Sequence, residues 1–261
     1  MTPEQTGEAA SILLSNWDAT TRIAALPEGC RPASREDGYA IAAALAEQSG
    51  DFVAGWKIAA TSEAGQKHIN VDGPLAGRIL ARRLLAPGAT IPLAGNLMRV
   101  AEAEFAFVLG TDMPGRGTPY SRDEVMAAVT ALHLSIEVPD SRYEDFTKVG
   151  ASSLIADTAC AAWLALGPAV DVEWRDIDLA SHQVTAFRNG AQAALGSGKA
   201  VLGDPRIALT WLVNEVARYG GGVRAGQFVT TGTCVIPVKI ESGDTISADY
   251  GVLGTIAVAI G

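Results

Sequence analysis

The chain is predicted to fold as an α+β protein, with a helical N-terminal segment followed by a mostly β region. Two observations support this. Residues 1 to about 50 combine helix-start signals with helically spaced apolar residues, whereas from Phe52 onward short apolar segments are separated by Gly, Pro, Asn and Asp. The length of 261 residues, 48% of them hydrophobic, is enough to bury one substantial core. We therefore predict a helical segment over residues 1–50 and a β-rich domain over residues 51–261.

Two helices are expected in the N-terminal segment. Thr2-Pro3-Glu4-Gln5 supplies an N-cap, a proline at the first helical position and a glutamine at the third, whose side chain can bond back to the cap. After a linker marked by prolines, a second helix starts near Ser34 and runs to about Gln48. Apolar residues follow both start signals, as expected of helices that pack on a core.

The β region contains short segments with the apolar pattern of strands, bounded by turn residues. Two helices interrupt it. Ser121-Arg122-Asp123-Glu124 has the form of a capping box and predicts a helix from 121 to about 131. Asp204-Pro205 begins the other helix, which runs to Tyr219 before three glycines. The expected strands are residues 53–58, 101–109, 132–138, 181–188, 228–231, 245–249 and 254–260.

The composition argues against several classes of partner. A net charge of −9 does not suit a nucleic-acid backbone, because such binding needs clusters of Lys and Arg. No apolar run is long enough to span a bilayer, and the first residues lack the pattern of a secretory signal. Cys30, Cys160 and Cys234 are far apart and odd in number, as expected of free thiols in a reducing compartment. We therefore predict a cytoplasmic protein without nucleic-acid or membrane partners.

Three glutamates stand in two neighbouring strand segments. Glu102 and Glu104 point to the same face of a strand, with their Cβ atoms roughly 7 Å apart, while the opposite face is apolar. Glu137 lies in the next strand, and a strand–helix–strand connection can make the two strands neighbours. Buried carboxylates need a partner, and a hard divalent cation suits an all-oxygen site. The alternative is a solvated face of an edge strand, which the apolar surroundings disfavour.

Two basic residues are further candidates, each with an ordinary alternative. Lys57 stands alone in an apolar segment, where it either reaches the surface or serves as a buried charge partner or proton carrier. Arg142 follows Glu137 closely and either clamps a carboxylate or forms a loop salt bridge with Asp140. The pattern of residues leaves both alternatives open in each case.

The turn Thr230-Thr231-Gly232-Thr233 closes a predicted strand with hydroxyl groups and a glycine. Backbone N–H groups and threonine oxygens at such a turn can bind an anion, although similar turns are common without ligands. Thr231 and Gly232 are therefore candidates for contact with an anionic group.

Taken together, these segments resemble the fumarylacetoacetate hydrolase superfamily, within it the branch of 2-keto-4-pentenoate hydratases and 4-oxalocrotonate decarboxylases. The resemblance covers nearly the whole chain and rests on the order and spacing of several motifs. The motifs are Asp37-Gly38-Tyr39-Ala40-Ile41, Gly55-Trp56-Lys57-Ile58-Ala59-Ala60-Thr61-Ser62, Val71-Asp72-Gly73-Pro74, Glu102-Ala103-Glu104-Phe105-Ala106-Phe107-Val108-Leu109-Gly110, Ile136-Glu137-Val138-Pro139-Asp140-Ser141-Arg142, Ala225-Gly226-Gln227-Phe228-Val229-Thr230-Thr231-Gly232-Thr233, Gly243-Asp244-Thr245 and Gly251-Val252-Leu253-Gly254.

The resemblance implies a mixed β-rich roll of the fumarylacetoacetate hydrolase type, in which residues 51–261 form a catalytic domain with a metal site. The implied activity is that of a Mg²⁺- or Mn²⁺-dependent hydratase, a hydro-lyase, acting on a short 2-oxo or 2-hydroxydienoic acid from the degradation of aromatic compounds. It also implies a homo-oligomer, paired with a related decarboxylase or hydratase. The implied site residues are Glu102, Glu104 and Glu137 for the metal, Lys57 for acid/base chemistry, and Arg142, Thr231 and Gly232 for the substrate.

The chain departs from the resemblance at three positions. Leu75 stands where many hydratases have an aspartate, and Thr158 and Cys160 stand where the branch has an asparagine and a serine. The three glutamates are unaffected, so the changes bear on the reaction rather than on the metal. They leave three alternatives open: a decarboxylase of the 4-oxalocrotonate type with Arg142 on the second carboxylate, an acylpyruvate hydrolase, and a non-catalytic partner subunit.

Overall fold

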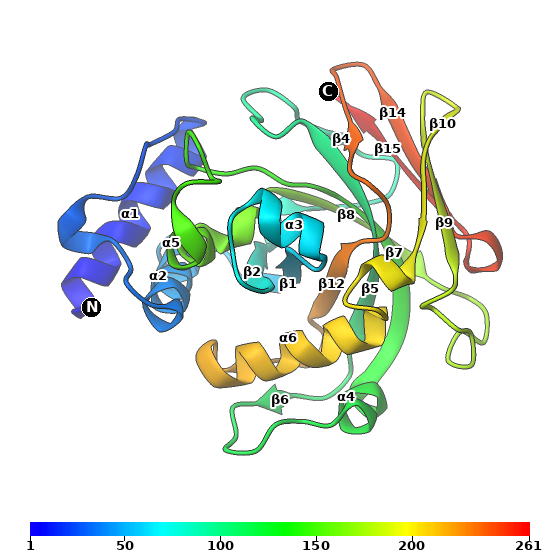
Figure 1. The fold of residues 1–261 in the computed structure, drawn as a ribbon, viewed down its shortest axis with the longest axis horizontal. Coiled ribbons are helices and arrows are strands. Elements are labelled where there is room, and N and C mark those ends of the chain that lie inside the picture. The colour runs from blue at the N-terminus through cyan, green and yellow to red at the C-terminus, as the bar shows by residue number, and fades with distance from the viewer.

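A computed structural model describes all 261 residues and confirms the α+β class. Helices α1 (Pro3–Ala19) and α2 (Arg35–Gln48) lie together at one side of the molecule, on the left in Figure 1. Both begin with the reciprocal hydrogen bonds of a capping box, which Thr2 and Ser34 make with the third residue of each helix.

The main sheet has eight strands in the order β2-β1-β12-β5-β7-β8-β3, with β13 pairing to β5. Neighbours are antiparallel except β1 with β12 and β3 with β8. This order places the two glutamate-bearing strands, β5 and β7, side by side near the middle of the sheet. The bounds are β1 Val53–Ala59, β2 Leu75–Leu80, β3 Leu84–Leu85, β5 Val100–Leu109, β7 Val129–Val138, β8 Trp163–Ala169, β12 Phe228–Thr233 and β13 Val238–Lys239.

A second sheet, of five strands in the order β10-β9-β14-β15-β4, lies on the right in Figure 1. Aromatic packing joins it to the main sheet: the ring of Phe105 on β5 lies 5.1 Å from that of Tyr250, which follows β14. A separate pair of strands is formed by β6 and β11. The bounds are β4 Thr90–Ile91, β6 Met113–Pro114, β9 Gln183–Arg188, β10 Ala191–Ser197, β11 Gly222–Val223, β14 Thr245–Asp249 and β15 Thr255–Ile260.

The remaining helices connect and cover the sheets. The helix α6 (Pro205–Tyr219) begins and ends where the sequence predicts. The prediction of a helix to about residue 131 is wrong, because α4 (Arg122–Ala128) gives way to β7 at Val129, which pairs with Leu109 of β5. The other helices are α3 Glu63–His68 and α5 Gly150–Ala156, with short 3₁₀ turns at Glu28–Cys30, Ala81–Arg83, Thr158–Cys160, Gly198–Ala200 and Gly251–Leu253.

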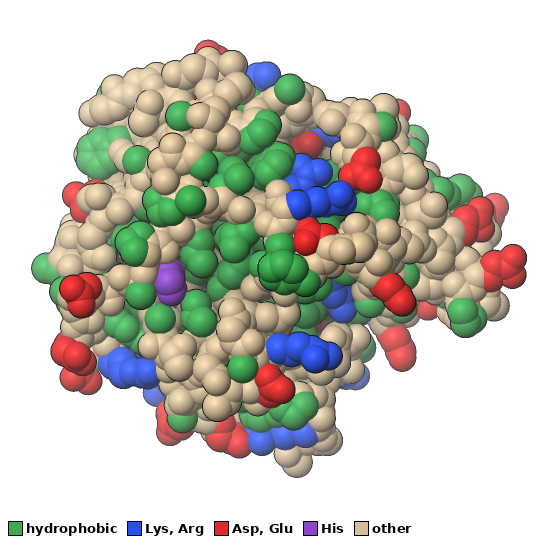
Figure 2. Space-filling view, turned by 180° about the vertical axis from the view of Figure 1, so that it is seen from behind, with side chains coloured by type: hydrophobic (Ala, Val, Ile, Leu, Met, Phe, Trp, Pro, Cys, Tyr) green, Lys and Arg blue, Asp and Glu red, His purple; other side chains and the backbone are tan.

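The N-terminal helices have a hydrophobic cluster of their own. It contains Leu13, Trp17, Ile41 and Leu45 together with Tyr143 from the β region, whereas the larger cluster fills the space around the two sheets. The division of the chain at residue 50 stays a prediction. No helix is long and apolar enough to cross a membrane. Hydrophobic side chains gather across the middle of the face in Figure 2, and charged side chains of both signs are scattered, mostly toward its margin.

Candidate metal and substrate site

The pairing of β5 with β7 brings the three glutamates together. Glu102 lies directly opposite Glu137 in the antiparallel register, and Glu104 lies opposite Ser135. One carboxylate oxygen from each glutamate lies within 4.8 Å of the others. Glu104 and Glu137 are fully buried and Glu102 is half-buried, so the cluster is largely removed from water.

Several oxygens of this cluster have no hydrogen-bond partner. Oε1 of Glu104 and both carboxylate oxygens of Glu137 are buried and accept no hydrogen bond of ordinary geometry. Such groups are rare in folded proteins, because an unsatisfied buried acceptor is costly and a charged one more so. A divalent cation bound by one oxygen from each glutamate would offset this cost, so the donor set fits a hard metal ion.

The other oxygen of Glu104 is held in place by β12. The Thr230 hydroxyl donates a hydrogen bond to Oε2 of Glu104, and the N–H of Gly232 donates to the same atom at 2.8 Å. Oε1 is thereby left free on the side of the other two carboxylates. Thr230 was not among the predicted site residues; the strand alternation that puts Thr230 and Gly232 on one face is the signal that could have found it.

The structure places Thr231 and Gly232 as supports of the strand pair. The Thr231 hydroxyl donates to the carbonyl of Phe105 at 3.0 Å and is fully buried. Gly232 has a φ of +99°, and a Cβ there would lie 2.5 Å from Oγ1 of Thr61. Only glycine fits this backbone, which aims its N–H at Glu104.

Lys57 extends from β1 into the carboxylate cluster. Its Nζ lies 3.1 Å from Oε1 of Glu137 and donates a hydrogen bond to the carbonyl of Ala159 at 3.0 Å. The side chain is 3% exposed, so it does not reach the surface. The sequence left open whether Lys57 reaches the surface or serves as a buried charge partner, and in the structure it is a buried charge partner.

The carbonyl that receives Lys57 belongs to a left-handed turn. Thr158, Ala159 and Cys160 have φ angles of +51°, +51° and +61°, although none of them is glycine. Such a conformation costs free energy at each residue and persists only where the surroundings enforce it. Gly77 of β2 is one such neighbour, because a Cβ there would lie 1.9 Å from the carbonyl oxygen of Thr158.

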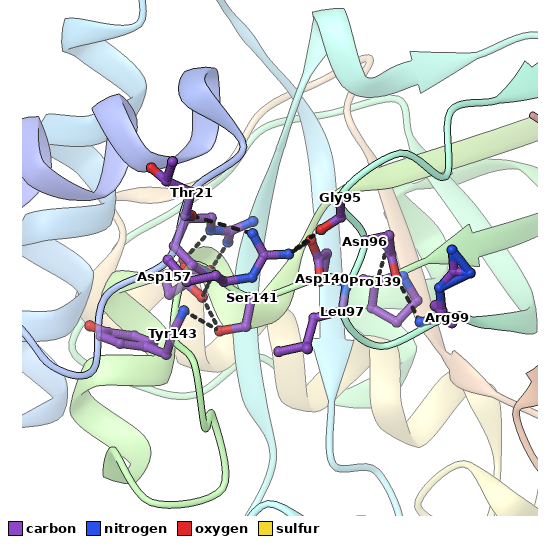
Figure 3. A network of polar contacts seen from close by, with 12 residues as sticks. Thr21, Gly95, Asn96, Leu97, Arg99, Pro139, Asp140, Ser141, Tyr143 and Asp157 are labelled. Carbon is purple, nitrogen blue, oxygen red and sulfur yellow. Dashed lines mark hydrogen bonds and ion pairs between the residues drawn. The ribbon is translucent and has the colours of Figure 1, made fainter.

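Arg142 secures this turn from the other side and does not face the glutamates. Its guanidinium pairs with the buried carboxylate of Asp157 and donates to the carbonyl of Ala161 at 2.8 Å. Ser141 donates to the second oxygen of Asp157 at 2.7 Å, in the network drawn in Figure 3. The expected alternative partner of Arg142, Asp140, binds Arg22 instead, at 2.5 Å. The donors of Arg142 are therefore directed to the chain itself.

Burial controls the protonation of the cluster. It raises the pKa of Glu102 to about 7, and the charge of Glu137 adds to this rise. Burial also raises the pKa values of Glu104 and Glu137. Burial alone would lower the pKa of Lys57, but the charges of the three glutamates raise it above its usual value. Without a second cation, the cluster thus tends to hold a proton near neutral pH while Lys57 stays charged.

Leu75 and Cys160, two of the departures from the family pattern, are both buried. Leu75 is fully buried and pairs with Ala59 at the end of β1, so an apolar side chain stands where the resemblance expects an acid. Burial raises the pKa of the Cys160 thiol to about 12, so this group is neutral and a weak nucleophile.

The chain is similar to proteins of known activity over nearly its whole length. It is 33% identical to a 2-keto-4-pentenoate hydratase of Burkholderia vietnamiensis over 90% of this chain and 89% of that protein. It is 32% identical to a 4-oxalocrotonate decarboxylase of Pseudomonas putida over 81% of this chain and 78% of the relative. A scan against protein-family models finds no match.

Solved structures agree with these relatives. The 4-oxalocrotonate decarboxylase of Pseudomonas putida G7, complexed with magnesium and adipate, superposes with a TM-score of 0.88 at 26% identity, over 100% of this chain and 98% of that one. The same enzyme is known with calcium and acetate, with a TM-score of 0.86. A fumarylacetoacetate hydrolase of Exiguobacterium antarcticum shares the fold, with a TM-score of 0.58 at 20% identity over 80% of this chain and 75% of that one.

The fold, the share of each chain that aligns and the sequence identity to both kinds of enzyme identify the family of this chain. The chain belongs to the family of 2-keto-4-pentenoate hydratases and 4-oxalocrotonate decarboxylases, and it shares the fold of a fumarylacetoacetate hydrolase.

Proposed function

We propose that the chain is a divalent-metal-dependent hydro-lyase of the hydratase type, acting on a short 2-oxo or 2-hydroxydienoic acid from the degradation of aromatic compounds. The observation that carries the proposal is the cluster of three carboxylates, two of which are fully buried and have oxygens that accept no hydrogen bond. The hydratases among the relatives support the reaction type, and the magnesium and calcium complexes of the structural neighbour support the class of cofactor.

In this proposal Glu102, Glu104 and Glu137 hold Mg²⁺ or Mn²⁺. Their donors are all carboxylate oxygens, which suit these hard cations better than Zn²⁺. When bound, the ion supplies Lewis-acid polarisation of a 2-oxo group and stabilises the negative charge that develops there. Thr230 and Gly232 keep Glu104 in one orientation for this purpose.

Lys57 is proposed to carry the proton. Its ammonium group is fixed between Glu137 and the carbonyl of Ala159, at the edge of the carboxylate cluster. Because its pKa is raised, it is protonated at neutral pH and acts as an acid, or orients the substrate carboxylate by charge. Thr231 and Arg142 act indirectly, since their donors are used by Phe105 and Asp157.

Decarboxylation of a vinylogous 2-oxo diacid is the second candidate. The decarboxylases among the relatives favour it, and Leu75 removes an acid that could activate water for addition. Against it, the Arg142 guanidinium is buried and already donates hydrogen bonds to Asp157 and to the carbonyl of Ala161. The product of the reaction therefore decides between the two.

We also propose that the protein works in the cytoplasm as a homo-oligomer, beside a related decarboxylase or hydratase. Three large apolar side chains, Phe52, Ile236 and Val252, are 71%, 80% and 72% exposed and are the candidates for burial at an interface between subunits. Light scattering of the purified protein measures the number of subunits.

The test is turnover with Mg²⁺ or Mn²⁺ on a panel of 2-hydroxydienoates, 4-oxalocrotonate and acylpyruvates, with products identified by mass. We expect a hydrated product from a 2-hydroxydienoate, and loss of activity on adding EDTA. Glu104→Gln should lose at least about a hundredfold in turnover, whereas the exposed control Glu173→Gln should not change. Activity that survives both EDTA and Glu104→Gln would contradict the metal site. Metal binding without turnover on any panel member would instead indicate a non-catalytic subunit.

A further inference from the structure

A second cavity lies away from the three glutamates. It has a volume of about 240 Å³ and is bounded by the end of α1, the loop between β4 and β5, and the start of β8. Three arginines line it: Arg22, Arg83 and Arg142. Part of its wall is the network in Figure 3, where Asp140 and the carbonyl of Gly95 accept hydrogen bonds from Arg22 at 2.5 and 2.6 Å.

The charges of this cavity do not balance. Arg22 is paired with Asp140 and Arg142 with Asp157, whereas no carboxylate lies within salt-bridge distance of Arg83. The adjacent Arg82 takes the remaining acid, Asp18, at 3.2 Å on the surface. Burial and the charges of Arg82 and Arg142 lower the pKa of Arg83 to about 10, so its guanidinium is still charged at neutral pH. One positive charge therefore remains uncompensated.

Two hydrogen-bond donors of the same arginines are also unused. Nε of Arg83 and Nε of Arg22 are both buried and have no acceptor. A buried donor without a partner is costly, more so on a charged group. An anion in the cavity would accept from the arginines and neutralise the extra charge, and the planar guanidinium is suited to a carboxylate.

Two tryptophans, Trp17 and Trp163, are among the residues that line the cavity. The guanidinium of Arg83 lies over two indole rings, 4.9 Å from the centre of Trp17 and 4.5 Å from that of Trp163. Arg142 stacks on Trp17 as well, at 4.2 Å. These contacts hold Arg83 in position, and the two indoles are the aromatic part of the cavity's lining. A cavity of about 150 Å³ is known to bind benzene, so about 240 Å³ has room for a ring with a carboxylate.

We propose that this cavity binds a small, planar monocarboxylate, with its charge on Arg83 and its flat body against Trp17 and Trp163. One uncompensated guanidinium selects a single negative charge, and the indole walls favour a conjugated or aromatic body over a compact anion. The ligand would bridge α1 and β8, and would so fasten the N-terminal helices to the main sheet. This inference does not depend on the proposed function.

The test is titration calorimetry of the full chain in EDTA, with benzoate as the probe and acetate and inorganic phosphate as comparisons. We expect saturable binding of benzoate with quenching of tryptophan fluorescence, and weaker binding of both comparison anions. Arg83→Gln should weaken benzoate binding at least about tenfold, because a charge-assisted hydrogen bond is lost. The neighbouring, surface-exposed Arg82→Gln is the matched control and should bind like the unaltered chain.

Two further variants test whether benzoate binds through the indole and whether it binds in this cavity. Trp163→Leu should weaken benzoate binding and leave acetate binding unchanged, while circular dichroism melts report whether each variant is folded. Glu104→Gln should bind benzoate normally, which separates this cavity from the glutamate cluster. The inference is overturned if benzoate does not bind, if Arg83→Gln binds it as well as Arg82→Gln, or if phosphate binds more tightly than benzoate. It is also overturned if Arg83→Gln instead dissociates an oligomer, since an acidic side chain of a second copy would then fill the cavity.

Discussion

At the scale of single residues, the two carboxylate oxygens of Glu104 have different surroundings. Oε2 accepts from the Thr230 hydroxyl and the Gly232 N–H, while Oε1 is free and close to Glu102 and Glu137. Hydrogen bonds to the second oxygen of a metal ligand fix its orientation and so raise the affinity for the ion. The same logic makes Thr230 a positioning residue.

The Thr230→Val substitution tests this role. It keeps the shape of the side chain but removes the hydroxyl donor to Glu104, so we expect Mg²⁺ to bind about 10- to 100-fold more weakly. Thr231→Val is the matched control, because its hydroxyl donates to Phe105 on the other side of the strand. Calorimetric titration with Mg²⁺ measures both. Equal loss in the two variants would mean that the effect is on folding.

Lys57 can be separated from the metal ligands by the Lys57→Met substitution. The variant lacks the proposed proton carrier, so kcat should fall by about 10²- to 10⁴-fold. Metal affinity should not fall, because removing a neighbouring positive charge lowers the repulsion of the ion. Steady-state kinetics and Mg²⁺ titration measure the two effects, with the exposed Lys199→Met as control. A loss of metal binding together with activity would argue against the acid/base role.

At the scale of elements, the site depends on a strained turn between α5 and β8. Residues Thr158–Cys160 run in the left-handed region and present the Ala159 carbonyl to Lys57. The buried pair of Arg142 and Asp157 holds the start of this turn, and Gly77 allows it to approach β2. The strain is thus enforced by contacts on both sides.

Breaking the buried pair should be costly. Asp157→Asn leaves the Arg142 guanidinium without its counter-charge, and we expect the free energy of unfolding to fall by about 3–5 kcal/mol. Urea denaturation measures this change. Asp145→Asn removes an exposed pair with Lys148 and should leave the midpoint almost unchanged. Similar small shifts in both variants would show that the turn does not need Asp157.

At the scale of the whole molecule, the packing of the sheets offsets the unfavourable free energy of bringing three carboxylates together. The glutamates stand on β5 and β7, which are neighbouring strands near the middle of the main sheet. In this setting the burial that raises their pKa values also makes a bound cation stabilising for the entire fold.

The stability of the metal-free protein should therefore fall as the pH rises. The pKa of Glu102 is about 7 in the folded chain and has an ordinary value of 4.5, so the folded state holds an extra proton between these pH values. This contribution is fully present below about pH 4.5 and is lost as the pH rises through 7, amounting to at most about 3 kcal/mol. Saturating Mg²⁺ should abolish the fall, because the cation replaces the proton. Melting temperatures with EDTA and with Mg²⁺ between about pH 5 and pH 8 measure it, and Glu102→Gln should make the EDTA curve less steep.

Some strands were not predicted because their amino-acid composition is unusual for a strand. The strand β2 contains Gly77 and Arg78, β8 contains Pro168, and β10 is rich in alanine, so none has the usual composition of a strand. Gly77 is needed in β2 because the carbonyl of Thr158 lies against it. These strands form because neighbouring strands pair with them, and that pairing cannot be predicted from the residues of the strands themselves.

The sequence by itself determined the features that depend on residues a few positions apart. The capping boxes at Thr2, Ser34 and Ser121 span three residues, and the shared face of Glu102 and Glu104 follows from the two-residue period of a strand. The family motifs added the prediction of Glu137 as a third ligand.

Only the tertiary structure decided which groups those residues meet. The hydrogen bond from Thr230 to Glu104 joins residues 126 positions apart, and that from Lys57 to Ala159 joins residues 102 apart. Arg142 was expected to meet a substrate or Asp140 and meets Asp157 instead. Partners this distant depend on the register and order of the strands, which the packing of both sheets determines together, so no local pattern of residues can specify them.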